Sequence, residues 1–251
     1  MTFNRYGDIC AEIYDIDKPF GRLPDTAFYL ETLASVRGPI LEPAVGTGRT
    51  LIPLLEAGHE VYGFDPSDEM LDRCRGRCLD RGLKAHLSKM RFEDFAYDMR
   101  FTAILVPVSS FTFVTEFDTA LAVLRRFHNH LEQGGRLIID LTLLGGLRSR
   151  GDDIRSWNAP DGDLLTAHGK RVETNYLAQT IVTHYRYERW RDNRLIDAQL
   201  ELMRQRFWGA NEFEMALAAS GFDEVSIFGG YKRRPPREDD WFVTFEARRR
   251  A

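Results

Sequence analysis

The chain has 251 residues, of which 43% are hydrophobic, and a formal net charge of −4. This length allows a full α/β core with one modest additional module. The charge gives no reason to expect nucleic acid or an anionic membrane as a general partner. The three cysteines, Cys10, Cys74 and Cys78, are too few and too scattered for a disulfide framework. With no signal peptide and no apolar run of membrane-spanning length, we expect a cytoplasmic protein that does not contact membranes.

The first 38 residues are predicted to form a helical cap. Ile9, Ile13 and Tyr14 follow a helical spacing of apolar residues. Asp25 is a candidate N-cap of a second helix, which is expected to stop at Gly38.

A strand, a tight turn and a helix are predicted next. The apolar pair Ile40-Leu41 leads to Gly46-Thr47-Gly48, and an apolar helical pattern follows until Gly58. Glycines let the backbone turn sharply and approach a ligand without an obstructing Cβ. About twenty residues later a second strand ends at Asp65, where an acid can accept hydrogen bonds from ribose hydroxyls. This pattern predicts a site for a nucleotide-like cofactor.

Strands and helices continue to alternate up to about residue 145. Ser67 is the candidate N-cap of the helix after Asp65. The remaining predicted elements are a helix over 67–82, strands over 85–87 and 101–107, a helix over 117–131 and a strand over 136–141. Such alternation predicts a doubly wound parallel sheet.

The pattern changes after residue 145. Residues 145–169 read as a loop, and long polar strands are predicted over 171–179, 181–190 and 194–208, with Asp192-Asn193 as a hairpin turn. We interpret these strands as a small antiparallel lid. A helix over 211–220, with Asn211 and Glu214 as a capping box, and strands over 222–228 and 241–246 then return to the main sheet.

The expected fold is α/β and Rossmann-like, with a seven-stranded, mostly parallel sheet, an antiparallel last strand and a small antiparallel β lid. Four segments are expected: a helical cap (1–38), a cofactor-binding core (39–145), the lid with its loop (146–208), and the last helix and strands (209–251). The lid could pair with a second copy or be covered by its own loop, so a monomer and a homodimer are both compatible with the sequence.

The glycine turn distinguishes between two kinds of cofactor. A dinucleotide fingerprint requires a third small residue after the pair of glycines, but Arg49, Thr50 and Leu51 follow Gly48. An acid, Glu42, precedes the turn instead, and Ala44 stands at the first of three glycine positions. This pattern resembles motif I of the class I S-adenosylmethionine (SAM)-dependent methyltransferases. The resemblance extends over nearly the whole chain and is strongest to small-molecule N- and O-methyltransferases with a β-sheet lid.

The resemblance implies SAM as the cofactor. Gly46 and Gly48 would contact its methionine part, Glu42 would hold the loop or the amino group, and Asp65 would hold the ribose. In the family the turn after the third strand often reads Asp-Met, whereas here it reads Lys89-Met90, so the adenine contact is expected from the backbone N–H groups of Met90 and Arg91. The residues implied to bind the cofactor are Tyr14, Glu42, Pro43, Ala44, Gly46, Thr47, Gly48, Asp65, Pro66, Met70, Met90, Arg91, Val106 and Pro107.

The methyl acceptor is predicted to be a small molecule. Methyltransferases that act on base amines or glutamine carry an Asn/Asp-Pro-Pro-aromatic run after the fourth strand, and this chain has Val106-Pro107-Val108-Ser109 there. A neutral amine needs no strong base, whereas a hydroxyl acceptor would benefit from one. No metal is expected, because no cluster of ligating residues appears. The candidate catalytic residues are Tyr14, Ser109 and His184, and the candidates for substrate binding are Ser109, Ser110, Phe111, Phe113, Tyr185 and Trp208.

Three alternative functions are compatible with parts of the sequence. The glycine turn alone fits a nucleotide-dependent oxidoreductase. A non-catalytic SAM-binding protein would share every cofactor residue. The basic stretches 232–237 and 248–250 would suit an RNA or protein methyltransferase, although a solvated loop and a frayed tail explain them better.

Overall fold

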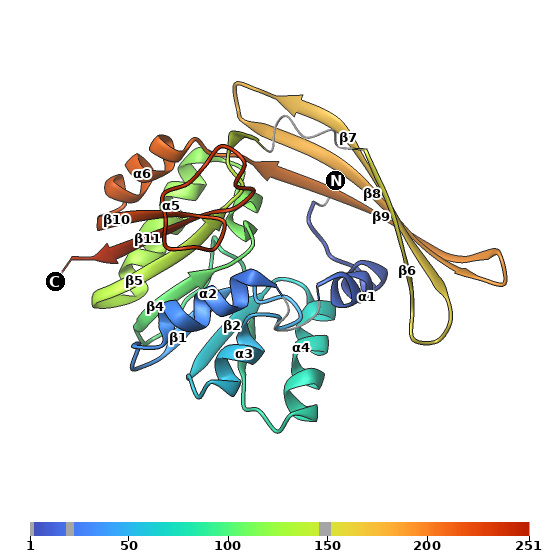
Figure 1. The fold of residues 1–251 in the computed structure, drawn as a ribbon, viewed down its shortest axis with the longest axis horizontal. Helices are drawn as coiled ribbons and strands as arrows, with labels where there is room; N and C mark the ends of the chain where they lie inside the picture. Colours follow the sequence, from blue (N-terminus) through green and yellow to red (C-terminus); the bar gives the residue numbers. More distant parts are fainter. Residues whose placement is uncertain (1–2, 19–22, 146–151, 251) are drawn as a thin grey trace.

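The computed structural model describes residues 3–18, 23–145 and 152–250. Its strands form two sheets, one of seven strands and one of four. Figure 1 shows the larger sheet with helices on both faces, the smaller sheet extending away from it, and α1 (Asp8–Asp17) between the two. We call the smaller sheet the lid.

The main sheet has the strand order β10-β11-β5-β4-β1-β2-β3. The central strands from β3 to β5 are parallel, and β11 is antiparallel to both of its neighbours, β5 and β10. This arrangement confirms the predicted fold class. The strands are β1 (Ile40–Pro43), β2 (Val61–Asp65), β3 (His86–Lys89), β4 (Phe101–Val106), β5 (Leu131–Leu141), β10 (Phe222–Gly229) and β11 (Val243–Arg249).

Each face of the main sheet buries its own apolar cluster. On one face Leu33, Ile52 and Leu71 pack beneath the helices. On the other, Phe127 and Phe213 pack against the sheet, since apolar residues recur at helical spacing along α5. The helices are α2 (Pro24–Leu33), α3 (Leu51–Glu56), α4 (Asp68–Asp80), α5 (Phe117–His130) and α6 (Ala210–Ala219), with a short 3₁₀ helix η1 (Ser110–Phe113).

The lid is an antiparallel sheet of four strands in sequence order. They are β6 (Asp153–Asn158), β7 (Leu164–Asn175), β8 (Thr180–Arg191) and β9 (Arg194–Arg206). The loop predicted over 145–169 is therefore wrong where β6 and the start of β7 lie, and its residues 146–151 are outside the described part. Most of β6 is exposed, so its sequence lacks the apolar alternation by which a half-buried strand is identified.

Two predicted helix caps are also wrong, and one is confirmed. Asp25 lies inside α2, which begins at Pro24, and its carboxylate is buried against Arg49. In α6 the N-cap is Gly209, whose backbone N–H donates to Glu212 Oε2 at 3.1 Å. Ser67 caps α4 as predicted, accepting the Met70 N–H at 3.2 Å.

Candidate functional site

The turn after β1 has the backbone conformation that a glycine motif requires. Ala44, Gly46 and Gly48 have positive φ angles of 54°, 57° and 85°. Ala44 therefore adopts a conformation that favours glycine, at a cost of roughly 1 kcal/mol. A Cβ on Gly48 would lie 2.7 Å from Cys74 Sγ, whereas a Cβ on Gly46 would meet no atom within 4 Å. Gly48 thus permits close packing on α4, and Gly46 borders open space.

Asp65 connects this turn to the start of α4. Its Oδ2 accepts the Gly46 N–H at 3.0 Å, and its Oδ1 accepts the Ser67 N–H at 2.9 Å. The residue is 7% exposed, and burial raises the pKa of its carboxyl to about 6 despite the two backbone hydrogen bonds. Each carboxylate oxygen can accept a further hydrogen bond, so Asp65 can hold the loop and still receive ribose hydroxyls.

Three buried polar atoms at the turn, one of them Arg49 Nε, lack hydrogen-bond partners among the described residues. Glu42 is 1% exposed, and its Oε2 has no hydrogen-bond partner among the described residues; the same holds for Thr47 Oγ1. Burial raises the pKa of Glu42 well above its ordinary value, and the nearby Arg49 only partly counteracts this. Buried polar groups are normally hydrogen-bonded. These orphan atoms fit the charged amino-acid part of SAM, which can supply the missing partners.

Arg49 lies next to Gly48 in the turn. Its guanidinium donates to both carboxylate oxygens of Asp25, at 3.0 and 2.7 Å. Burial lowers the pKa of Arg49, but the hydrogen bond to Asp25 and the nearby Tyr14 hydroxyl outweigh burial and raise it. Arg49 thus fixes α2 and the glycine turn together and places Tyr14 beside that turn.

The turn after β3 explains the departure at Lys89. The Lys89 ammonium pairs with Asp68 at the start of α4, and both side chains are exposed. The Met90 N–H donates to the Asp65 carbonyl at 3.3 Å, and the Arg91 N–H donates to Asp94 Oδ1 at 2.9 Å. Both predicted backbone donors therefore already have intramolecular acceptors, and the Lys89 side chain is directed to α4.

The turn after β4 is strained, and hydrogen bonds with residues at the end of β5 hold it in place. Val108 and Ser109 both have positive φ angles, 53° and 59°. The Val108 N–H donates to Asp140 Oδ2 at 3.2 Å, and Ser109 Oγ accepts the Thr142 N–H at 2.6 Å. Ser110 Oγ donates to the Pro107 carbonyl at 2.9 Å. The hydroxyl of Ser109 thus joins β4 to β5, a role in the framework of the site.

Asp140, at the end of β5, is a buried acid that the sequence interpretation missed. It accepts hydrogen bonds from the hydroxyls of Tyr29, Tyr231 and Thr244, the last two at 3.1 and 2.7 Å. Burial raises the pKa of Asp140 to about 6, although these donors act in the opposite direction. A charged residue inside the apolar strand 136–141 was the signal that could have identified it.

The predicted substrate-binding residues and the catalytic candidate His184 lie in different parts of the structure. Phe111 and Trp208 are fully buried in the main core, where their rings pack on Phe213. Tyr185 lies on the lid face that packs against α1. His184, its neighbour on β8, lies on the opposite face of the lid because side chains alternate along a strand. Only Phe113 and Tyr185 remain near the N-terminal residues that cover the glycine turn.

Tyr6 is a second residue that the sequence interpretation missed. Its carbonyl accepts a hydrogen bond from Ser67 Oγ at 3.2 Å, and its ring packs edge-on against Phe113 at 5.9 Å. Burial raises the pKa of its hydroxyl, and the neighbouring Cys10, Tyr14, Asp65 and Tyr185 add to the effect. Tyr6 therefore lies between Asp65 and the lid.

Two expected absences concern metals and membranes. The described residues contain no group of three or more His, Cys, Asp or Glu side chains that could hold a metal ion. No helix in the described ranges is long and apolar enough to cross a membrane.

Comparison with known proteins agrees with this geometry. Residues 40–135 match the family model of a methyltransferase domain. Among curated proteins, the cypemycin N-terminal methyltransferase of a Streptomyces species is 31% identical over 123 residues, which is 49% of each protein. The chain thus matches about half the length of that relative.

Solved structures match over the whole chain. The CcbJ methyltransferase of Streptomyces caelestis superposes with a TM-score of 0.81 at 21% identity, covering 100% of both chains. SAM-bound CalS10, an amino pentose methyltransferase of Micromonospora echinaspora, has a TM-score of 0.70 at 17% identity and covers 99% of this chain and 100% of its own. Residues 40–135 therefore resemble a methyltransferase domain, and the chain has the fold of the class I SAM-dependent methyltransferases.

Proposed function

We propose that this protein transfers the methyl group of SAM to a nitrogen or oxygen atom of a small-molecule acceptor and releases S-adenosylhomocysteine. The observation that carries the proposal is the turn after β1. There the left-handed Ala44, the open side of Gly46 and the unpartnered Glu42 carboxylate form a cradle for a charged ligand.

The acceptor atom that best suits the site is an amine nitrogen. Ser109 is bonded to Thr142, and His184 lies on the outer lid face, so neither is placed to remove a proton from a hydroxyl. A neutral amine attacks with its own lone pair and needs no base to do so. The names of an N-terminal methyltransferase and an amino pentose methyltransferase among the similar proteins support the same class.

The reaction requires orientation more than acid–base chemistry from the protein. SAM supplies an electrophilic methyl group. The glycine turn and Asp65 would hold the cofactor, Tyr14 and Tyr6 would cover it, and Phe113 with Tyr185 would border the acceptor. Orientation and exclusion of water together account for several kcal/mol of a typical barrier reduction.

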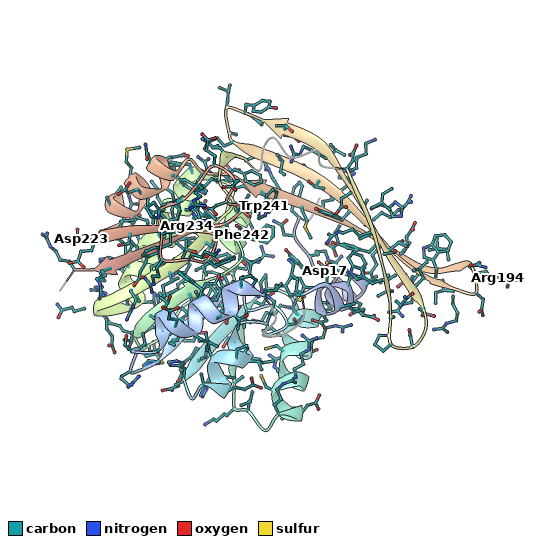
Figure 2. The ribbon with its side chains drawn as sticks, in the orientation of Figure 1. Asp17, Arg194, Asp223, Arg234, Trp241 and Phe242 are labelled. Carbon is teal, nitrogen blue, oxygen red and sulfur yellow. The ribbon has the colours of Figure 1, made fainter. Side chains whose placement is uncertain are left out.

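The structure gives less support to two of the alternatives, the nucleotide-dependent oxidoreductase and the RNA or protein methyltransferase. The third glycine position of a dinucleotide loop is occupied by Leu51, and Arg49, next to Gly48, is buried and bound to Asp25. In the basic stretch, Arg233 pairs with Glu246 and Arg234 with Asp240. Arg234, Trp241 and Phe242, labelled in Figure 2, belong to the loop that precedes β11. These arginines stabilise the C-terminal loop.

Cofactor binding is the first test. Calorimetric titration should give micromolar binding of SAM and S-adenosylhomocysteine to the wild type. Asp65→Ala removes both the ribose acceptor and the tie to Gly46, so affinity should fall by about 30-fold or more. Asp72→Asn, an exposed acid on α4, is the matched control and should bind normally. Absence of binding to the wild type would refute the proposal.

Acceptor class is the second test. The enzyme with labelled SAM should be offered matched pairs of amines and alcohols, including amino sugars and their hydroxyl counterparts. We expect methylated products from amines only, detected by mass spectrometry. Methylation of the alcohols alone would contradict the amine assignment while leaving SAM dependence intact.

A further inference from the structure

Three buried carboxylates lie near the carboxyl ends of three parallel strands of the main sheet, with β4 between β5 and β1. Glu42 lies in β1, Asp65 ends β2, and Asp140 lies at the end of β5, with exposed fractions of 1%, 7% and 0%. The carboxyl ends of parallel strands meet at the same edge of a sheet, which is where ligands bind in such folds. The three acids therefore belong to the cofactor-binding edge.

None of these carboxylates has a cation of its own. In the part of the chain that the structure describes, the ion pairs include none of the three. Asp65 is held by backbone N–H groups, and Asp140 by hydroxyls and one N–H. The guanidinium nearest to Glu42 is that of Arg49, and both of its terminal nitrogens are bonded to Asp25.

The groups that face the acids are mostly neutral or negative, although the Arg77 guanidinium donates to the Thr47 carbonyl at the turn at 3.3 Å. Asp25, Asp65 and the Cys74 thiol face Glu42 in addition to Arg49. Asp65 is faced by the Tyr6 hydroxyl. The hydroxyls of Tyr29 and Tyr231 face Asp140, and the Asp25 charge also raises the pKa of both hydroxyls. Among these groups the acids outnumber the guanidiniums of Arg49 and Arg77, and buried charge of one sign is costly until an opposite charge arrives.

We propose that Glu42, supported by Asp65 and Asp140, makes this site prefer the positively charged cofactor over its neutral product. This inference rests on the proposed function. SAM and S-adenosylhomocysteine share adenine, ribose and the amino-acid part. They differ by one methyl group and one positive charge on sulfur. Two unit charges about 10 Å apart change binding by roughly tenfold or more at an effective dielectric constant of about 20, before solvent screening reduces the effect. Loss of the methyl group would therefore also loosen the product.

The same arrangement couples cofactor binding to protons. Burial raises the pKa of Asp65 and of Asp140 to about 6, and that of Glu42 in the same direction. A cation nearby favours the ionised form, so SAM binding expels protons that these acids carry below neutral pH. Affinity for SAM should rise with pH through this range, and affinity for S-adenosylhomocysteine should rise less.

Calorimetry of the 251-residue chain tests both the preference for SAM and its coupling to protons. Both ligands are titrated at about pH 5.5 and about pH 7.5, in buffers of different ionisation enthalpy that report released protons. We expect more protons released with SAM, and a preference for SAM over S-adenosylhomocysteine that grows about threefold or more with pH. Glu42→Gln keeps the side-chain shape but removes the charge, and should reduce the preference at the higher pH by about three- to tenfold.

The experiment on Glu42→Gln has a matched control and a result that would contradict the inference. Glu60→Gln makes the same change at an exposed position before β2 and should keep the wild-type preference. If Glu42→Gln weakens both ligands by the same factor, Glu42 acts on a group that they share, and the inference is overturned. Thermal melting checks that the variant is folded, and Asp140→Asn, which should shift the preference in the same direction, provides a second variant. Lack of binding by the wild type would refute the proposed function instead.

Discussion

At the scale of single residues, Asp140 organises more of the site than any side chain that the motifs pointed to. Its carboxylate joins Tyr29 of α2, Val108 after β4, Tyr231 of the C-terminal loop and Thr244 of β11. The strained Val108-Ser109 turn is thus fixed by a buried acceptor rather than by its own sequence. Hydrogen bonds to a charged group are worth roughly 1.5–3 kcal/mol each.

Asp140→Asn should have a pH-dependent effect on stability. The folded protein holds a proton on Asp140 up to a pKa of about 6, against an ordinary value of 3.8. A raised carboxyl pKa favours the folded state at low pH, and this contribution disappears as pH rises through the folded pKa. Asparagine does not titrate. Its destabilising effect should therefore be larger at about pH 4.5 than at about pH 7, by about 2 kcal/mol.

Thermal and urea unfolding of both proteins across this range would measure the difference. Asp197→Asn removes an exposed acid from the lid and should show no such trend. A constant difference between Asp140→Asn and the wild type would mean that Asp140 titrates alike in the folded and unfolded chains.

Local spacing and residue type together determined which candidate site residues could be identified from the sequence. The spacing of Glu42, the glycines and Asp65 is local, so their common position at one turn could be predicted from the sequence. Phe111 and Trp208, predicted to bind the substrate, lie in the main core. An aromatic residue has the same sequence signature in a core and in a binding site. Tyr6 was missed because its partners, Ser67 and Phe113, are distant in sequence.

At the scale of elements, the two glycines of the turn have separable roles. Gly46→Ala and Gly48→Ala both place a side chain at positive φ, which should cost about 1 kcal/mol. Gly48→Ala also drives Cβ to within 2.7 Å of Cys74 Sγ, so it should destabilise the protein by about 3 kcal/mol. Gly46→Ala extends into open space and should mainly weaken cofactor binding.

Urea unfolding together with S-adenosylhomocysteine titration separates these effects. Adding Cys74→Ala should restore part of the stability of Gly48→Ala and none of the affinity of Gly46→Ala. Equal destabilisation by both single variants would show that the contact with α4 is unimportant.

The predicted elements were most accurate where burial imposed a pattern. β4 and α5 carry continuous or periodic apolar residues, so their positions agreed closely with the sequence. The strand β6 has an exposed side-chain set, including Ile154 at 74% exposure, so only its pairing with β7 defines it. The cap of α6 shifted to Gly209 because Glu212, and not Glu214, reaches back to the N-cap N–H.

At the scale of the whole molecule, α1 connects the lid to α4, which packs beside the glycine turn. On one side Asp15 pairs with Arg77 and Arg73 of α4, at 2.7 and 3.3 Å. On the other side Glu12 pairs with Arg189 of β8, and Asp17 with Arg155 of β6. Asp17 is labelled in Figure 2 at the α1 end, while Arg194 marks the far tip of the lid. Ligand binding at the turn should therefore be transmitted to the lid through α1.

Asp15→Asn tests this connection because it removes two ion pairs to α4 and leaves the lid contacts in place. In the wild type, S-adenosylhomocysteine should slow backbone hydrogen exchange both in α1 and in β8. In Asp15→Asn the protection of β8 should fall, even with enough ligand to saturate the site, because local opening depends on few contacts. Asp72→Asn, which breaks an exposed pair on α4, is the control and should retain it. Undiminished protection of β8 in Asp15→Asn would mean that the ligand acts on the lid directly, through Tyr6 and Tyr185, without α1.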